Sequence, residues 1–237
     1  MERRGRFLIC LVWSAEPLSL DHADLDAQRF ANVTAITSQT VLPVAQPDIK
    51  RVLLYGKLVD RLYQEFGSVL PVRYGTFVRD QNEIGQLLER NYDRIVAEFA
   101  RTEGKVEIGV RIIIRSTPGT VPSVSLTESP DEQANFGTGR RFLRDRLRIT
   151  AGTMDRVRIA GDVVRELEEV LKPRFAERQV RLDQVSDLMV NAAYLVPTAL
   201  VDEFLLTVRS HARKRPGIGY MISGPWPPYS FVSLVLE

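Results

Sequence analysis

The clearest pattern of apolar and polar residues in this chain is a strict alternation near its middle. Five apolar residues stand two positions apart there: Val106, Ile108, Val110, Ile112 and Ile114. Residues two apart point to the same face of a β-strand, so the segment predicts a strand with one face in a core. Runs of apolar and β-branched residues predict two more strands in this half, at Arg6–Trp13 and Val69–Thr76.

Two less regular segments lie between these strands. Residues 21–31 combine three aspartates with Leu25 and Phe30, which predicts a short polar helix. Residues Ala35–Val44 carry β-branched side chains and end at Pro43. Because proline cannot donate a hydrogen bond to a neighbouring strand, this segment predicts an edge strand.

Apolar residues at spacings of three and four predict amphipathic helices. One follows Pro47 and carries its stripe from Ile49 to Phe66, through positions that include Val52, Tyr55 and Val59. A second begins at Asp80, where Glu83 three residues later forms a variant of the capping box, and ends at Gly104. Two more are predicted at 159–171, stopped by Pro173, and at 201–208, after Pro197.

The composition changes at Ser116–Pro130, where Ser, Thr, Pro and Gly dominate. This change predicts a linker at 116–133 between an N-terminal α/β domain, 1–115, and a C-terminal domain, 134–237. Strands of the second domain are predicted at 180–185, 188–196 and 218–222. Its order of helix, strand, strand, helix, strand favours an α+β two-layer sandwich of ferredoxin-like type.

Composition narrows the class of protein. The chain has 237 residues, 44% of them hydrophobic and 26% charged, as in a soluble globular protein. A net charge of +2 does not indicate nucleic acid as the main partner. Cys10 is the single cysteine and stands in an apolar run, which predicts a buried thiol and a cytoplasmic protein.

Candidate catalytic and metal-binding residues have simpler explanations. His22 and Asp26 have helical spacing, but one such pair does not make a metal site, and we predict none. His211 lies in the basic end of a helix, where positive charge complements the helix dipole. Glu166, Glu168 and Glu169 fall on the polar side of a helix, where solvation accounts for them. We therefore predict no enzyme activity, no cofactor and no small-molecule substrate.

A basic segment provides the alternative function. Residues 136–141 resemble a phosphate-binding loop before a helix but lack the Gly-Lys-Ser/Thr ending of a P-loop. Arginines crowd the helix predicted at Arg140–Arg148, so a phosphate- or RNA-binding protein or enzyme using this region is the second hypothesis. Asp145 among those arginines and the low net charge favour instead a solvated or partner-facing surface.

A stiff aromatic segment lies near the end of the chain. Its eight residues are Gly224, Pro225, Trp226, Pro227, Pro228, Tyr229, Ser230 and Phe231. Three prolines fix three φ angles and exclude a helix, so the aromatic rings are presented from a rigid, extended path. Such a segment either locks the chain end onto its own core or docks a partner. Because it follows a predicted core strand, we interpret it as a rigid corner that pins the C-terminal tail.

The sequence resembles the gas vesicle protein F/L family. The segment Gly224–Phe231 is similar to that family's signature. A second segment matches the family's Leu-Pro-Val-Arg-Phe-Gly-Thr, with tyrosine in place of the usual phenylalanine: Leu70, Pro71, Val72, Arg73, Tyr74, Gly75 and Thr76. Gly104–Val110 and Ala193–Val196 match two further family blocks, so the resemblance runs from about residue 69 to 231.

The resemblance implies a role and an architecture. Family members are non-enzymatic accessory or minor structural proteins of gas vesicles, the hollow protein shells that give cells buoyancy. The resemblance therefore implies partners in the main shell protein and other gas vesicle accessory proteins, and a location in the cytoplasm at the gas vesicle. It also implies two domains of modified ferredoxin-like character.

Overall fold

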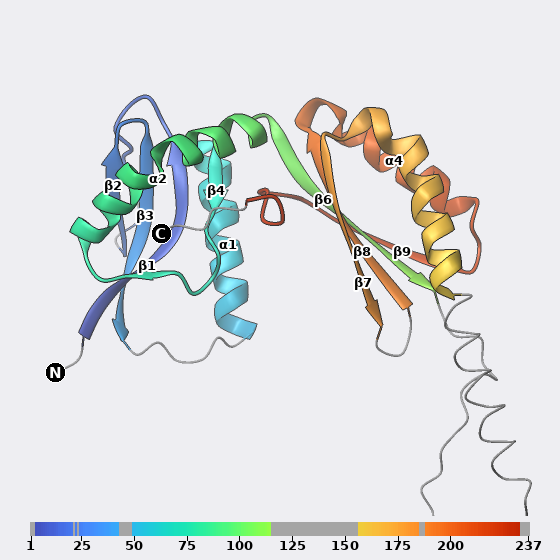
Figure 1. Ribbon diagram of the computed structural model, residues 1–237, viewed down its shortest axis with the longest axis horizontal. Helices are drawn as coiled ribbons and strands as arrows, with labels where there is room; N and C mark the ends of the chain where they lie inside the picture. Colours follow the sequence, from blue (N-terminus) through green and yellow to red (C-terminus); the bar gives the residue numbers. More distant parts are fainter. Residues whose placement is uncertain are drawn as a thin grey trace, which may run out of the picture.

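Two antiparallel sheets form two lobes that lie side by side (Figure 1). The computed structural model describes residues 3–20, 22, 24–42, 49–114, 156–184 and 188–232. The first sheet has the strand order β2-β3-β1-β4, with β5 also paired to β1. Its strands are β1 (Arg3–Trp13), β2 (Leu25–Phe30), β3 (Val33–Leu42), β4 (Val69–Pro71) and β5 (Phe77–Val78). The helices of this lobe are α1 (Ile49–Phe66) and α2 (Gln81–Thr102).

The two helices cover opposite faces of the first sheet. Leu8 and Leu11 of β1 pack in one apolar cluster with the buried face of α2. Ile9 and Val12 point the other way and pack in a second cluster with Tyr55 and its neighbours on α1. Apolar residues on both faces of β1 therefore make it the central strand, as the apolar run of its sequence suggests. Cys10 is fully buried there, as predicted, and burial raises the pKa of its thiol.

Two predictions for the first lobe are wrong. Residues 21–31, expected to be helical, contain the strand β2, and β3, expected at an edge, lies between β2 and β1. A two-residue turn with Ala31 at φ 49° joins β2 to β3, and Asp26 forms an ion pair with Arg6 of β1. Pairing across the sheet thus overrides the helical preference that the local sequence indicated.

The second sheet contains the alternating strand near the middle of the chain. Its order is β7-β8-β6-β9. The strands are β6 (Lys105–Ile114), β7 (Glu177–Gln184), β8 (Leu188–Pro197) and β9 (Ile218–Trp226). Helical residues 156–171 and the helix α4 (Val201–Arg213), with short 3-10 turns at Lys172–Arg174 and Thr198–Leu200, complete the lobe. The order β6, helix, β7, β8, α4, β9 is the βαββαβ arrangement of a ferredoxin-like fold, which agrees with the predicted α+β class.

The strand β6 joins the second sheet, although the sequence analysis placed it in the N-terminal domain, 1–115. It pairs along its whole length with β8 and from Glu107 onward with β9. Its apolar face packs against Leu167 and Phe204 of the two helices. By sheet membership we place the boundary between the lobes at Gly104. The predicted linker, 116–133, and the basic region Arg140–Arg148 lie outside the described residues.

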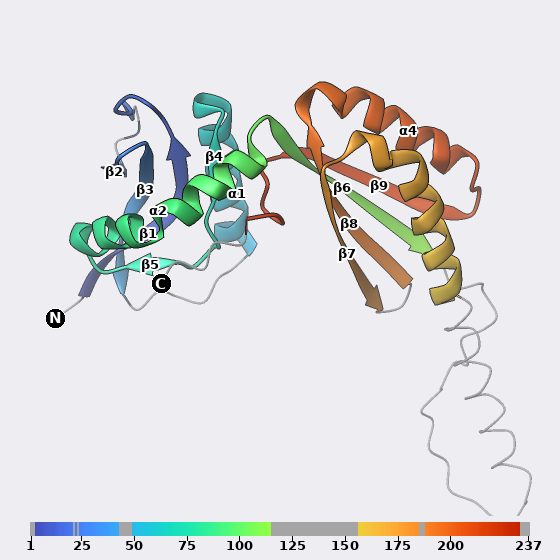
Figure 2. The ribbon, with the colours of Figure 1, turned by 45° about the horizontal axis from the view of Figure 1, so that its top comes forward.

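Only one face of the second sheet is covered. Both helices of the lobe lie on the same side of the sheet (Figure 2) and bury the even-numbered residues of β6. The odd-numbered side chains point to the other side, where Arg111 of β6 and Met221 of β9 are exposed. This uncovered face carries the groove described below.

The start of α2 confirms the predicted cap. The amide of Glu83 donates to Oδ1 of Asp80 at 2.9 Å, and the Glu83 carboxylate accepts the amide of Arg79 at 2.5 Å. The Asp80 side chain thus satisfies a backbone donor that the first turn of the helix leaves free, and the Glu83 carboxylate satisfies the amide just before the cap.

We expect Asp80→Ala to lower the free energy of unfolding by about 1 kcal/mol, the usual value of an N-cap side chain. Urea denaturation followed by circular dichroism measures the change. The control is Asp93→Ala, an exposed position on the same helix, which should change stability little. Equal losses in the two variants would contradict the capping role.

Candidate functional site

The C-terminal motif begins within β9. This strand runs from Ile218 to Trp226, whereas the sequence predicted a strand that ends at residue 222. Trp226 still pairs with Glu107 of β6, across a bulge in the register. Gly224 at this bulge has φ 105°, and a Cβ there would lie 2.6 Å from the Glu107 carbonyl oxygen. Only glycine combines this backbone conformation with so close an approach.

Residues Pro227–Val232 leave the sheet as a tight turn between the two lobes, here named the C-terminal strap (Figure 1). The amide of Tyr229 donates to the carbonyl of Pro227 at 2.7 Å, and the last two amides of the strap donate to the carbonyl of Pro228 at 3.1 Å. Both prolines are buried. The strap is therefore a folded element with its own hydrogen bonds.

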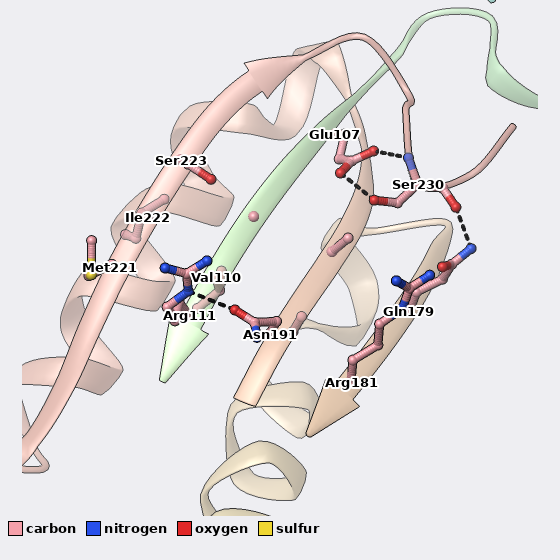
Figure 3. A pocket seen from close by; sticks show the side chains of 13 residues that line it. Glu107, Val110, Arg111, Gln179, Arg181, Asn191, Met221, Ile222, Ser223 and Ser230 are labelled. Carbon is pink, nitrogen blue, oxygen red and sulfur yellow. Dashed lines mark hydrogen bonds between the residues drawn. The ribbon is translucent and has the colours of Figure 1, made fainter. Parts of the chain in front are cut away.

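A buried carboxylate holds the strap on the second sheet. Glu107, only 8% exposed, accepts the backbone amide of Ser230 at 2.6 Å and the Ser230 hydroxyl at 2.7 Å (Figure 3). The side chain of Gln179 on β7 donates to the Ser230 carbonyl at 2.5 Å. Burial raises the pKa of the Glu107 carboxyl, and the hydrogen bonds from Ser230 oppose that rise.

An arginine on α2 links the strap to both lobes. Arg101 donates to the carbonyl oxygen of Phe231 and forms ion pairs with Glu98 of its own helix and Glu177 of β7, at 2.5 and 2.6 Å. The Phe231 ring is 3% exposed. One guanidinium thus joins α2, β7 and the strap at the boundary between the lobes.

Tyr229 reaches from the strap to α1. Its ring packs in the apolar cluster of α1 and the first sheet, and its hydroxyl lies 3.4 Å from the carbonyl oxygen of Gly56 and beside the carboxyl of Asp60. Burial raises the pKa of both Tyr229 and Asp60, while the hydrogen bond from the tyrosine opposes the rise for Asp60. The strap therefore contacts four elements, α1, α2, β6 and β7.

The second motif folds as a strand and a turn, where the sequence predicted one strand. Residues Val69–Pro71 form β4, and Gly75 at φ 92° allows the turn that leads to β5. The amide and hydroxyl of Thr76 both donate to the carbonyl of Arg73, at 3.2 and 2.7 Å. Tyr74 packs edge-on against Phe7 and Tyr55, with ring centroids 5.3 Å apart in both pairs.

The two motifs meet in one groove between the lobes. A cavity of about 640 Å³ is lined by Pro71, Arg73 and Tyr74 of the second motif and by Tyr229 and Ser230 of the strap. A second cavity, about 340 Å³, lies on the uncovered face of the second sheet (Figure 3). Arg181 and Ser230 line both cavities, so they form one continuous surface, here named the interlobe groove.

Other candidate residues from the sequence lie apart from this groove. His22 faces Glu65 at 3.3 Å, and over the described residues no group of three or more His, Cys, Asp or Glu is placed to hold a metal ion. Burial lowers the pKa of His211, which disfavours the positive charge that its position in the sequence suggested. Within the same described ranges, no helix is both long and apolar enough to cross a membrane.

The glutamates near 168 are more than solvated side chains. Glu166 pairs with Arg215, and Glu168, 8% exposed, pairs with Arg178 of β7. These ion pairs join helical residues 156–171 to the turn before β9 and to β7. The phosphate-like loop, 136–141, lies outside the described residues.

Sequence reasoning missed Glu107, Arg101 and Gln179. Glu107 carried a usable signal, because it is the one charged residue between Val106 and Val110 in an otherwise uncharged stretch. A carboxylate at such a position needs a partner when the strand is buried. Arg101 and Gln179 carried no comparable signal, because polar side chains at partly exposed positions on a helix and an edge strand do not require a partner within the chain.

Trp226 and Phe231 should differ in their effect on stability. Phe231→Ala removes a buried ring and is expected to lower the free energy of unfolding by about 3–5 kcal/mol. Trp226 is 41% exposed, so Trp226→Ala should cost about 1 kcal/mol. Chemical denaturation of the two variants compares them directly. A larger loss for Trp226 would contradict this division within the motif.

The Glu107 carboxyl should also make stability depend on pH. Its folded pKa lies above the ordinary value near 4.5, so its protonation favours the folded state. That contribution is full below the unfolded pKa and is lost as pH rises through the folded pKa. The stability of the native protein relative to Glu107→Gln should therefore fall as pH rises above the ordinary pKa of a glutamate. Urea denaturation of both proteins at several pH values measures this difference in stability. A difference that does not change with pH would contradict a raised pKa of the Glu107 carboxyl.

Comparisons with known proteins agree on one family. The model of the family described as gas vesicle synthesis protein GvpL/GvpF matches residues 5–233. Gas vesicle protein L of a Streptomyces species is 30% identical over 232 residues, which cover 93% of this chain and 85% of that protein.

Two crystal structures share the fold. Gas vesicle protein GvpF from Microcystis aeruginosa has a TM-score of 0.73 at 17% identity, covering 97% of this chain and 99% of that one. GvpF from an Anabaena species has a TM-score of 0.75 at 18% identity, covering 98% of this chain and 97% of that one. These findings confirm the resemblance seen in the two motifs, and the chain belongs to the gas vesicle protein L/F family.

Proposed function

We propose that this protein supports gas vesicle assembly as a non-enzymatic accessory protein that binds the main shell protein. Membership of the gas vesicle protein L/F family carries the proposal. In this role the protein acts in the cytoplasm and at the growing vesicle. Its mechanism is to cover apolar shell-protein surface that would otherwise aggregate before it enters the wall.

An exposed apolar surface at the start of α1 supports this mechanism. The predicted stripe of α1 is buried at Tyr55, Val59 and Leu62. Four apolar side chains in its first two turns are instead exposed: Ile49, Val52, Leu53 and Leu54, at 79, 42, 60 and 66%. Neighbouring apolar side chains left in water favour contact with another apolar surface.

The edge strand β9 provides a second suitable surface. It has no charged residue among its nine, whereas the opposite edge strand, β7, carries Glu177, Arg178, Arg181 and Asp183. Charged side chains protect a sheet edge against pairing with another chain, and β9 lacks them. Met221 and Trp226 on β9 are 56% and 41% exposed, so this edge offers both backbone groups and apolar side chains.

Co-purification tests the proposal. The tagged protein, co-expressed with the main shell protein, should retain it on an affinity column, and deletion of its gene should abolish or deform the vesicles. Normal vesicles in the deletion strain, together with no retention of the shell protein, would overturn the proposal.

Two variants should locate the contact. Leu53→Ser combined with Leu54→Ser removes apolar area from the exposed start of α1 and should lower retention of the shell protein roughly tenfold. The matched control is Leu206→Ser on α4, where an equally exposed leucine (64%) is replaced. Trp226→Ala tests the β9 edge in the same assay. Equal retention by all of these variants would exclude both surfaces.

A further inference from the structure

Two arginines on the uncovered face of the second sheet have no carboxylate partner among the described residues. Arg111 of β6 donates through Nε to the side-chain oxygen of Asn191 on β8 at 2.7 Å, and Arg181 lies on the edge strand β7, on the other side of β8 (Figure 3). Two other arginines of this lobe, Arg174 and Arg178, do pair with acids. Neither guanidinium of Arg111 or Arg181 forms an ion pair in the described part of the chain, although Asp183 of β7 lies on the same sheet face and is hydrogen-bonded to Asn191.

A hydrogen bond to Asn191 fixes the position of the Arg111 guanidinium. Asn191 accepts from Arg111 and donates through its own nitrogen to Asp183 at 2.5 Å, so the asparagine fixes the guanidinium without neutralising it. Two further carboxylates of this face are already engaged, Glu107 by both donors of Ser230 and Glu177 by Arg101. A fixed guanidinium loses little freedom when it binds, which strengthens its hydrogen bonds to an anion.

The positive charge continues along the interlobe groove. Arg181 lines both of its cavities, and Arg73 of the second motif lines the cavity on the side of the first lobe. Arg73 is exposed and forms no ion pair within the described ranges. Three arginines from β6, β7 and the turn after β4 thus follow one groove, where they complement a ligand with several negative charges.

The shape of the groove favours a polypeptide over a small molecule. Sites for small molecules enclose most of the ligand, whereas the residues that line the second cavity are spread over β6, β7, β8 and β9 (Figure 3). Its rim includes Met221, 56% exposed, beside the small residues Gly109 and Ser223. Arginine and methionine are both enriched in protein interfaces, so their combination here has the character of a protein contact.

We propose that the interlobe groove binds an extended acidic segment of a partner protein, whose carboxylates pair with Arg111, Arg181 and Arg73. This site is distinct from the apolar surfaces of α1 and of the β9 edge. It would take a partner with glutamate or aspartate side chains whether or not that partner is the shell protein. The guanidinium groups recognise carboxylates, and we propose that these carboxylates belong to a polypeptide.

Fluorescence anisotropy with the full-length protein tests the proposal. The probe is a labelled peptide in which glutamate alternates with threonine, and the comparison peptide has glutamine at each glutamate. We expect the glutamate peptide to bind with an affinity that falls as salt rises, and the glutamine peptide to bind at least tenfold more weakly. Equal binding of the two peptides would overturn the proposal.

Variants tie the binding to the groove. Arg111→Gln with Arg181→Gln should weaken the glutamate peptide roughly tenfold, while Arg209→Gln, an exposed arginine of α4 on the covered side of the sheet, should not change it. Arg111→Glu with Arg181→Glu should reverse the preference, so that a lysine peptide binds better than the glutamate peptide. Circular dichroism checks that each variant is folded.

A competition experiment distinguishes an acidic polypeptide from a simple anion as the ligand. Inorganic phosphate at millimolar concentration should displace little of the glutamate peptide, because it reaches one guanidinium pair and not the whole groove. Complete displacement of the peptide by phosphate would show that the groove binds simple anions, and would overturn the proposal of an acidic polypeptide. Unchanged affinity in the glutamine double variant would likewise overturn the proposal.

Discussion

The contact on which the two-lobed structure depends is the pair of hydrogen bonds from Ser230 to the buried carboxylate of Glu107. Removing a carboxylate from water is costly unless donors replace the lost water, and here one residue supplies both donors. Because the amide and hydroxyl of Ser230 must meet the same carboxylate, the strap can sit in one position only. The C-terminal motif is therefore fixed by the hydrogen bonds that it donates to the Glu107 carboxylate of β6.

That position lets the strap connect parts that the chain order separates. Tyr229 packs on α1, Phe231 is held by Arg101 of α2, and Ser230 is held by β6 and β7. The prolines stiffen the path between these contacts, so little entropy is lost when they form. The same rigidity leaves Trp226 at the edge of the sheet with 41% of its surface exposed. One motif thus combines residues that stabilise the fold with a residue suited to contact a partner.

The sequence predicted elements whose signals are local. The cap at Asp80, the helix α1 and the alternating strand β6 follow from spacing over a few residues, and the two family motifs identified the family. It did not predict β2, because this strand forms by pairing with β3, and the polar residues of 21–31 do not show that pairing. It also assigned β6 to the wrong lobe, since alternation shows that one face is buried but not which helices cover it.

The groove was the least predictable part. Arg73 was visible as part of a motif, but Arg111 and Arg181 lie in separate strands and meet only because β8 pairs with both β6 and β7. Whether an arginine forms an ion pair is a property of the folded surface, which spacing along the chain does not report. The motif at Gly224–Phe231 was open to interpretation as a lock or as a docking segment, and its contacts favour a lock with an exposed edge at Trp226.

Amide hydrogen exchange at Ser230, followed by NMR, tests the lock most directly. If Glu107 holds this amide as described, its exchange should be slow, with protection close to that of the paired amides of β6, and should accelerate strongly in Glu107→Ala. Exchange at the rate of an open loop in the native protein would contradict the account, because the strap would then not be fixed to the second sheet.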